Sequence, residues 1–196
     1  MLIDLSPMRG IRVDPERRTA RAQGGVQWGE LDRETQAFGL ATPGGRVTTT
    51  GIGGFTLGGG YGWLSTQHGL ACDNLISVDL ATADGRLVTA SEDENEDLFW
   101  ALHGGGGNFG VVTSFEFQLH PVGPHVLGGL LAYPHSAAEA VLEAFRDLID
   151  DAPDEFSLAA IATAAPPADF VPPEFHGHQV LVIVPAYAAI RPTARN

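Results

Sequence analysis

The 196-residue sequence has a single cysteine, few basic residues and no long apolar run. The one cysteine, Cys72, excludes an internal disulfide framework and metal clusters built on paired cysteines. No stretch of about 18 apolar residues is present, so the sequence contains no candidate membrane span. The N-terminal segment also lacks the basic start and apolar core of a secretory signal. These absences together predict a cytoplasmic protein without a membrane partner.

Positive charge is scarce in this chain. Lysine and arginine together number 11, against 24 aspartate and glutamate residues, for a net charge of −13. Nucleic acids and anionic membrane surfaces both require clustered basic side chains, so this balance argues against both as partners. An acidic protein that binds phosphate does so mainly with backbone N–H groups, at a turn or a helix N-terminus.

Glycine, in contrast, is abundant and clustered. The stretch GIGGFTLGGGYG, residues 51–62, has seven glycines in twelve positions. A glycine in a regular element costs roughly 0.5–1 kcal/mol relative to alanine, so turns with positive φ or a closely approaching ligand must offset that cost. No lysine follows the stretch, which excludes a nucleotide P-loop. Gly51, Gly53 and Gly54 match a dinucleotide-binding fingerprint only in part, because the next glycine is Gly58. A purely structural cluster of turns stays open at this point.

Hydrophobic periodicity predicts a mixed α+β chain. A tight Asp84-Gly85 turn joins the two strands of a predicted hairpin over 74–91. Other strands are expected at 11–13, 111–120, 125–134, 155–164 and 178–188. Helices are expected at 28–39, 91–103 and 136–153. The residue pattern of the sequence changes near residues 121–126, and we place a domain boundary there. The two predicted domains are residues 1–121 and 122–196.

Several finer expectations follow from these patterns. Two capping boxes are predicted, one formed by Ser91 with Glu94 and one by Ser136 with Glu139. The strand at 111–120 is expected to turn the following residues to one face: Val111, Thr113, Phe115, Phe117 and Leu119. Trp28, Leu31 and Phe38 are expected to form the apolar side of the first helix. The helix at 136–153 is expected to pack through Ala138, Val141, Leu142, Phe145, Leu148 and Ile149.

The order of motifs resembles a known family. The glycine stretch is followed by Asp73-Asn74, the Asp84-Gly85 hairpin, DLFWAL at 97–102 and GGGGNFGVVT at 104–113. This order is similar to that of FAD-linked oxidases of the vanillyl-alcohol oxidase and berberine-bridge enzyme type. The resemblance covers about residues 2–190 and is strongest over 41–121. It implies the second part of a p-cresol methylhydroxylase-type FAD-binding domain, followed by the start of an antiparallel-sheet substrate domain.

The resemblance also implies a cofactor site and a reaction. Backbone close to the FAD pyrophosphate and ribityl chain would come from Thr50, Gly51, Gly53, Gly54 and Gly58. Backbone beside the flavin would come from Asn108, Gly110, Val111 and Val112. The implied reaction is oxidation of a small-molecule substrate by hydride transfer to FAD, with reoxidation by oxygen. No residue of 1–196 lies on a family motif for a catalytic base, so none is assigned.

The sequence departs from the family pattern at several places. It is expected to begin after a first subdomain that carries another phosphate-binding turn and a flavin-linking histidine, and to end within the substrate domain. A catalytically silent fragment, or an interaction module that retains part of the flavin fold, is therefore the alternative to an oxidase. Val47 occupies the position of a second, cysteinyl flavin link. Phe55 replaces a histidine found in some relatives, and Cys72 is expected to be a small buried apolar residue.

The remaining side chains that could bind a metal or take part in catalysis have simpler interpretations. His176 and His178 form a pair without a third ligand, so no metal site is predicted. The acidic run at 92–97 is expected to be a solvated helix start. His68 and His103 are expected at surface or capping positions. Trp63 and Trp100 are expected in the core, and Tyr61 is a candidate border of the flavin pocket.

Overall fold

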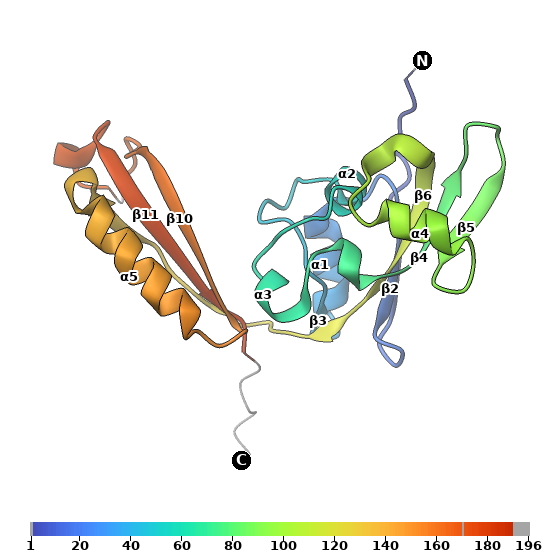
Figure 1. The fold of residues 1–196 in the computed structure, drawn as a ribbon, viewed down its shortest axis with the longest axis horizontal. Coiled ribbons are helices and arrows are strands. Elements are labelled where there is room, and N and C mark those ends of the chain that lie inside the picture. Colours follow the sequence, from blue (N-terminus) through green and yellow to red (C-terminus); the bar gives the residue numbers. More distant parts are fainter. Residues whose placement is uncertain (1, 170, 190–196) are drawn as a thin grey trace, which may run out of the picture. The chain divides into compact units, whose positions relative to one another are not determined.

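A computed structural model describes residues 2–169 and 171–189 of the chain (Figure 1). The described chain divides into two compact units, of which the first extends to Pro124 and the second runs from His125 to Ala188. The division between Pro124 and His125 falls within residues 121–126, where the sequence predicts a domain boundary. The assignment of the two parts to a flavin-binding and a substrate domain stays a prediction. No helix within the described residues is long and apolar enough to cross a membrane.

The first unit is built on a five-stranded antiparallel sheet. Its order is β1 (Ile11–Asp14), β2 (Thr19–Gln23), β6 (Val111–Gln118), β4 (Leu75–Ala81) and β5 (Leu87–Ser91). The predicted strands and the hairpin are therefore confirmed, and Gly85 has the positive φ that its tight turn requires. A small second ladder pairs β3 (Leu40–Ala41) with β7 (His120–Pro121).

One face of this sheet is apolar and the other is polar. The core cluster joins strand residues such as Val78 and Phe115 to helix residues such as Trp28 and Phe99. The helices of this unit are α1 (Trp28–Gln36), α2 (Ile52–Leu57), α3 (Ser65–His68) and α4 (Glu96–Leu102), with 3-10 turns η1 (Cys72–Asn74) and η2 (Gly106–Phe109). On the polar side, Arg21 bonds to carboxylates of β4 and β6. This one-sided burial fits an antiparallel sheet.

The face pattern of β6 is partly different from the predicted one. Phe115, Phe117 and Leu119 are buried as expected, but Val112 is buried in place of its two neighbours. The pairing register between β4 and β6 shifts by one residue at this point, from Asp79 with Ser114 to Leu80 with Val112. Such a β-bulge moves one extra residue into a strand and reverses which residues face the core.

Helix ends and exposed aromatic rings give further corrections. Ser91 accepts backbone N–H bonds from Asp93 and Glu94 in a separate turn, and α4 begins only at Glu96. The predicted Ser91 capping box is therefore wrong. Trp100 is 79% exposed because Phe99 and Leu102 of the same helix fill the core face.

The first helix and the second predicted capping box also differ from the prediction. Phe38 is 52% exposed, since α1 ends at Gln36 and the side chain lies beyond its last turn. At the start of α5 (Ala138–Asp150), Ala137 is the N-cap and has no side-chain bond to the helix. The Ser136 capping box is therefore also wrong, because a 3-10 turn, η3 (His135–Ala137), leads into this helix.

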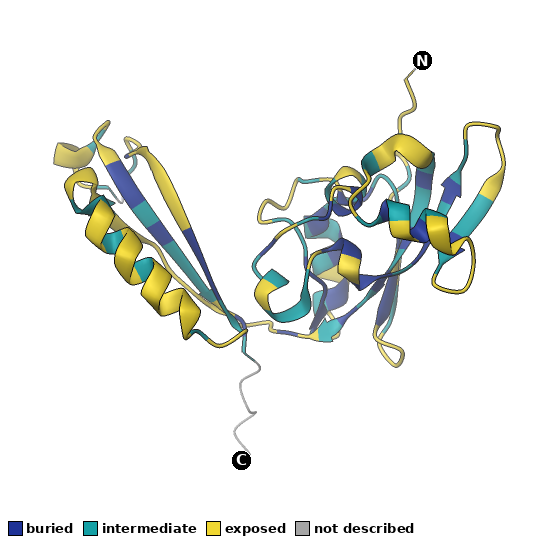
Figure 2. Cartoon of the chain, in the orientation of Figure 1, coloured by how far each residue is buried: buried dark blue, intermediate teal, exposed yellow. Residues whose placement is uncertain are grey.

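The second unit is a sheet with one helix, α5, packed on it (Figure 1). Its strands are β8 (Leu127–Gly128), β9 (Leu131–Pro134), β10 (Phe156–Ala164) and β11 (Gln179–Tyr187), and β11 pairs with the other three. Val141 and Phe145 of α5 pack against Leu158 and Leu181. Much of α5 is exposed on its other side (Figure 2). Three residues of the predicted stripe are also exposed: Leu142, Leu148 and Ile149.

Candidate flavin site

The start of α2 is fixed to the segment that precedes α1. The Ile52 N–H donates to the Val26 carbonyl at 2.9 Å, and the Trp28 N–H donates to the Thr50 carbonyl at 2.9 Å. Gln27 and Gly51 form a bridge between these two bonds. Backbone hydrogen bonds thus hold the first residues of the glycine stretch in place, and no side chain is needed to position them.

Part of the glycine stretch is explained by the chain's own packing. Gly60 has φ +82°, and a Cβ there would lie 2.6 Å from the Phe55 ring. A Cβ on Gly62 would lie 1.8 Å from the Gly44 carbonyl oxygen. No side chain fits at either position, since real Cβ atoms do not approach other atoms so closely. These glycines are required whether or not a ligand binds.

Three other glycines have no such internal reason. Gly51, Gly54 and Gly107 are exposed, have no positive φ, and would place a Cβ with nothing within 4 Å. Each of the remaining 22 glycines of the chain has either a positive φ or an atom within 4 Å of its Cβ position. Glycine in a regular element is costly without a compensating contact. The three positions therefore leave open backbone that an external group can approach.

The open glycines belong to two motifs that the fold brings together. Gly51 and Gly54 lie at the start of α2, and Gly107 lies in η2. These two elements are in contact, although about fifty residues separate them in the sequence. Asn108 closes η2 by donating its side-chain N–H to the Gly105 carbonyl at 2.9 Å. The two motifs quoted for the flavin site thus form one surface with few side chains.

The other residues of the expected site are more constrained. A Cβ on Gly110 would lie 2.5 Å from the Ala81 carbonyl, so this glycine is required by the contact with β4. Val111 and Val112 pair with β4, and the Val112 side chain is buried in the core. Gly53 and Gly58 have backbone neighbours at 3.4 and 3.3 Å from their Cβ positions. Contact of all these residues with a cofactor stays a prediction.

Apolar residues support this surface from behind. Phe55 of α2 meets the Trp28 ring edge-on, with 5.4 Å between centroids, and packs as expected for a residue without a hydrogen-bonding side chain. Cys72 is buried, and burial together with the neighbouring Asp73 carboxylate raises the pKa of its thiol to about 11. The thiol is therefore protonated at neutral pH and unreactive.

Several of the histidines have structural partners. His103 ends α4, and its Nδ1 bonds to the Phe99 carbonyl at 2.7 Å, which is the capping role expected for it. His176 bonds through Nε2 to the Val171 carbonyl at 2.9 Å. His68 is partly buried and stacks on His120, a pairing that the sequence analysis missed. Within the described residues, no three histidine, cysteine or acidic side chains are grouped as a metal site.

Comparison with known proteins agrees with this geometry. Residues 1–91 match the model of a family described as an FAD binding domain. The chain is 53% identical to the FAD-linked oxidoreductase pgmH of Aspergillus terreus over 124 residues. These aligned residues make up 63% of this chain and 25% of that protein. It is 38% identical over 156 residues to (R)-6-hydroxynicotine oxidase of Paenarthrobacter nicotinovorans, covering 76% of this chain and 34% of that one.

The fold gives the same answer. The structure of the BBE-like protein #28 from Arabidopsis thaliana matches with a TM-score of 0.84 and 29% identity, over 96% of this chain and 37% of that one. In sequence and in fold, the chain is similar to part of the FAD-linked oxidoreductases. The resemblance seen in the sequence motifs is confirmed, and so is the α+β flavin-domain fold. The chain spans 25% and 34% of the lengths of these two curated relatives.

Proposed function

We propose that the protein takes part in the FAD-dependent oxidation of a small molecule. The observation that carries the proposal is the surface formed by Gly51, Gly54 and Gly107, whose missing side chains have no reason in the chain's own packing. A flat cofactor with a pyrophosphate fits such a surface, because backbone N–H groups can bind phosphate and glycine permits close approach. When bound, FAD supplies the two-electron acceptor for a hydride from a substrate C–H bond.

In this proposal the protein binds and orients the cofactor. The backbone of Thr50, Gly51, Gly53 and Gly54 would hold the pyrophosphate. The Ile52 N–H is already bonded to the Val26 carbonyl, so the donors from the first turn of α2 would be the N–H groups of Gly53 and Gly54. Gly58 permits close approach further along the same helix. Asn108 and Gly110 shape the turn before β6, and Val111 and Val112 would present main chain to the flavin. The buried Trp28 and the partly buried Phe55, whose rings meet edge-on, support this surface from behind.

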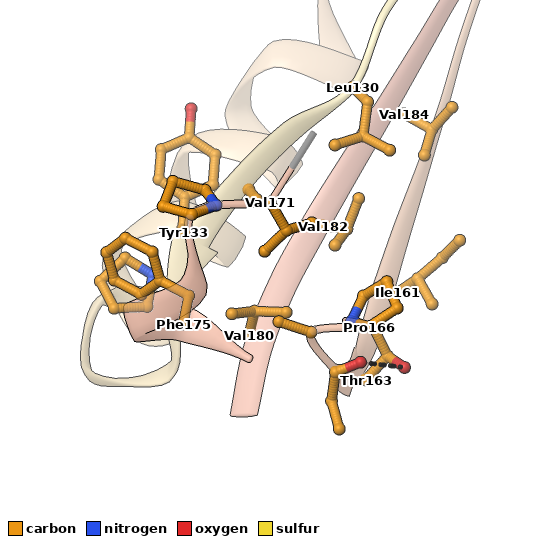
Figure 3. Close-up of a pocket in the computed structure, with 15 residues that line it drawn as sticks. Leu130, Tyr133, Ile161, Thr163, Pro166, Val171, Phe175, Val180, Val182 and Val184 are labelled. Atoms are coloured by element: carbon orange, nitrogen blue, oxygen red, sulfur yellow. Dashed lines mark hydrogen bonds between the residues drawn. The ribbon is translucent and has the colours of Figure 1, made fainter. Parts of the chain in front are cut away.

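The second unit is proposed to contribute to substrate binding. The face of its sheet that α5 does not cover borders a cavity of about 600 Å³, within the usual size of small-molecule sites. Val180, Val182 and Val184 of β11 lie along it, and Phe175 lies nearby (Figure 3). Tyr133 and Thr163 are its hydroxyl-bearing lining residues, and no described lining residue is charged. This composition favours an uncharged, largely apolar substrate portion.

The proposal is tested by the visible spectrum of the purified protein after FAD is added and the excess removed. Two visible flavin bands that travel with the protein support the proposal, because they report retained cofactor. Consumption of oxygen by that complex, with a panel of small alcohols and amines, then tests oxidation. Protein that retains no flavin contradicts the proposed function.

A further inference from the structure

Arg46 lies over two aromatic rings beside the flavin surface. Its guanidinium carbon is 4.9 Å from the centroid of the Tyr61 ring and 4.4 Å from that of Trp63. Tyr61 belongs to the glycine stretch, and Trp63 follows it directly. Cation–π attraction at these distances favours one position for the guanidinium. The expectation that Trp63 is a core residue is thereby changed, since its ring supports a cation at the surface.

The backbone beneath Arg46 is held in place as well. The segments that carry Arg46 and the two rings pass so closely that a Cβ on Gly62 would overlap the Gly44 carbonyl oxygen. A Cβ on the neighbouring Gly45 would lie 3.4 Å from the Phe55 ring and 3.5 Å from the Thr50 Cβ. The loop with Arg46 therefore packs against the start of α2, where the open glycines lie.

The charge of Arg46 is not balanced within the described part of the chain. Five other arginines form ion pairs with carboxylates, namely Arg9, Arg21, Arg33, Arg86 and Arg146. Arg46 is exposed, and no described carboxylate lies within salt-bridge distance of it. A guanidinium that is held through its face keeps its in-plane N–H donors for an oxyanion.

From these contacts we infer that Arg46 is an anion-recognition residue of the flavin surface. It binds an anionic oxygen group, either the pyrophosphate of FAD or a carboxylate of the substrate, in the site of the proposed function on which this inference rests. The rings of Tyr61 and Trp63 hold the cation in advance, so that less side-chain freedom is lost on binding. In a chain of net charge −13, one fixed cation also offsets repulsion of an anionic ligand.

A purely structural role makes a different prediction. If Arg46 only ties its loop to Tyr61 and Trp63, replacing it lowers the melting temperature and leaves ligand affinity unchanged. If it binds an oxyanion, the loss is specific to anionic ligands. Arg46→Gln removes the charge, whereas Arg46→Lys retains it without the planar fork. Arg17→Gln, at an exposed arginine in the β1–β2 turn, is the matched control for the loss of one positive charge.

The test measures the affinities of the full protein for FAD and riboflavin by fluorescence, and for benzoate by its effect on the bound-flavin spectrum. We expect Arg46→Gln to weaken one anionic ligand about tenfold, Arg46→Lys to weaken it less, and Arg17→Gln to have no effect. Loss for FAD but not riboflavin identifies the pyrophosphate as the partner. Loss for benzoate alone identifies a substrate carboxylate.

The inference is overturned if Arg46→Gln binds FAD, riboflavin and benzoate as the wild type does. It is also overturned if the affinities for FAD and riboflavin fall equally and benzoate binding is unchanged, because the charge then plays no part. Should Arg46→Gln fail to fold, Arg46→Lys is compared with the wild type for the same ligands, with the same two overturning results. Failure of the proposed function is distinct, since the wild type itself would then retain no FAD.

Discussion

His68 and His120 stack face to face, with 3.8 Å between ring centroids and 6° between ring planes. His120 Nε2 is 2.6 Å from Asn74 Oδ1, and the Asn74 amide donates to the carbonyls of His68 and Leu70. Because the Asn74 oxygen can only accept, His120 Nε2 carries the proton in this bond. These contacts connect β7 to α3 and η1, which follow the glycine stretch.

This stack predicts acid sensitivity of the fold. Burial lowers the pKa of both imidazoles, and the neighbouring His68 helps to lower that of His120 to about 4. The unfolded chain takes up protons near pH 6.5 while the folded chain resists them, so the free energy of unfolding decreases as the pH falls from about 6.5 to about 4. His120→Gln keeps a donor for Asn74 and removes this titration. We expect urea unfolding of the variant to depend less on pH in that window; an unchanged slope contradicts the assignment.

Asp32 on α1 predicts the opposite pH dependence. Burial raises the pKa of its carboxyl to about 6, so the unfolded chain loses this proton first and stability decreases as the pH rises from about 3.8 to about 6. Asp32→Asn is expected to increase the free energy of unfolding at pH 8 by on the order of 1–3 kcal/mol, and to change it little at pH 3.5. Denaturant unfolding at both pH values checks this, with the exposed Glu92→Gln as control. An equal effect at both pH values refutes the burial argument.

Gly60→Ala is expected to destabilise the first unit by about 1–3 kcal/mol, because its φ is +82° and the new methyl would overlap the Phe55 ring. Thermal unfolding measures the effect. Gly54→Ala is the matched control in the same stretch, and is expected to leave stability unchanged or increase it by up to about 1 kcal/mol, since it lies inside a helix with free space around it. Equal destabilisation by both substitutions would show that the open glycines are structural after all.

Local patterns in the sequence predicted most strands and helices correctly. The Asp84-Gly85 turn and the alternation around Phe115 depend on neighbouring residues only, so they can be read from the chain. The burial of Val112 depends on the register between β4 and β6, which no local pattern contains. Exposure of Trp100 has a similar cause, because Phe99 and Leu102 occupy the core face of the same helix.

The glycine motifs indicated where the candidate site lies. They could not show which glycines leave space for a ligand and which are required by packing. Gly54 and Gly60 cannot be told apart in the sequence. Only the structure shows that a Cβ on Gly54 would have open space around it, whereas one on Gly60 would overlap the Phe55 ring. The partners of Arg46 and His120 were missed for the same reason, since contacts between side chains of distant segments define them.

The affinity for FAD of Gly54→Ala and Gly107→Ala, measured beside their thermal stability, tests the central claim most directly. We expect each methyl group to enter space that the cofactor occupies when it binds, so FAD binding weakens about tenfold or more while the melting temperature is maintained. Wild-type affinity in both variants would contradict it, because the missing side chains would then have no part in binding FAD.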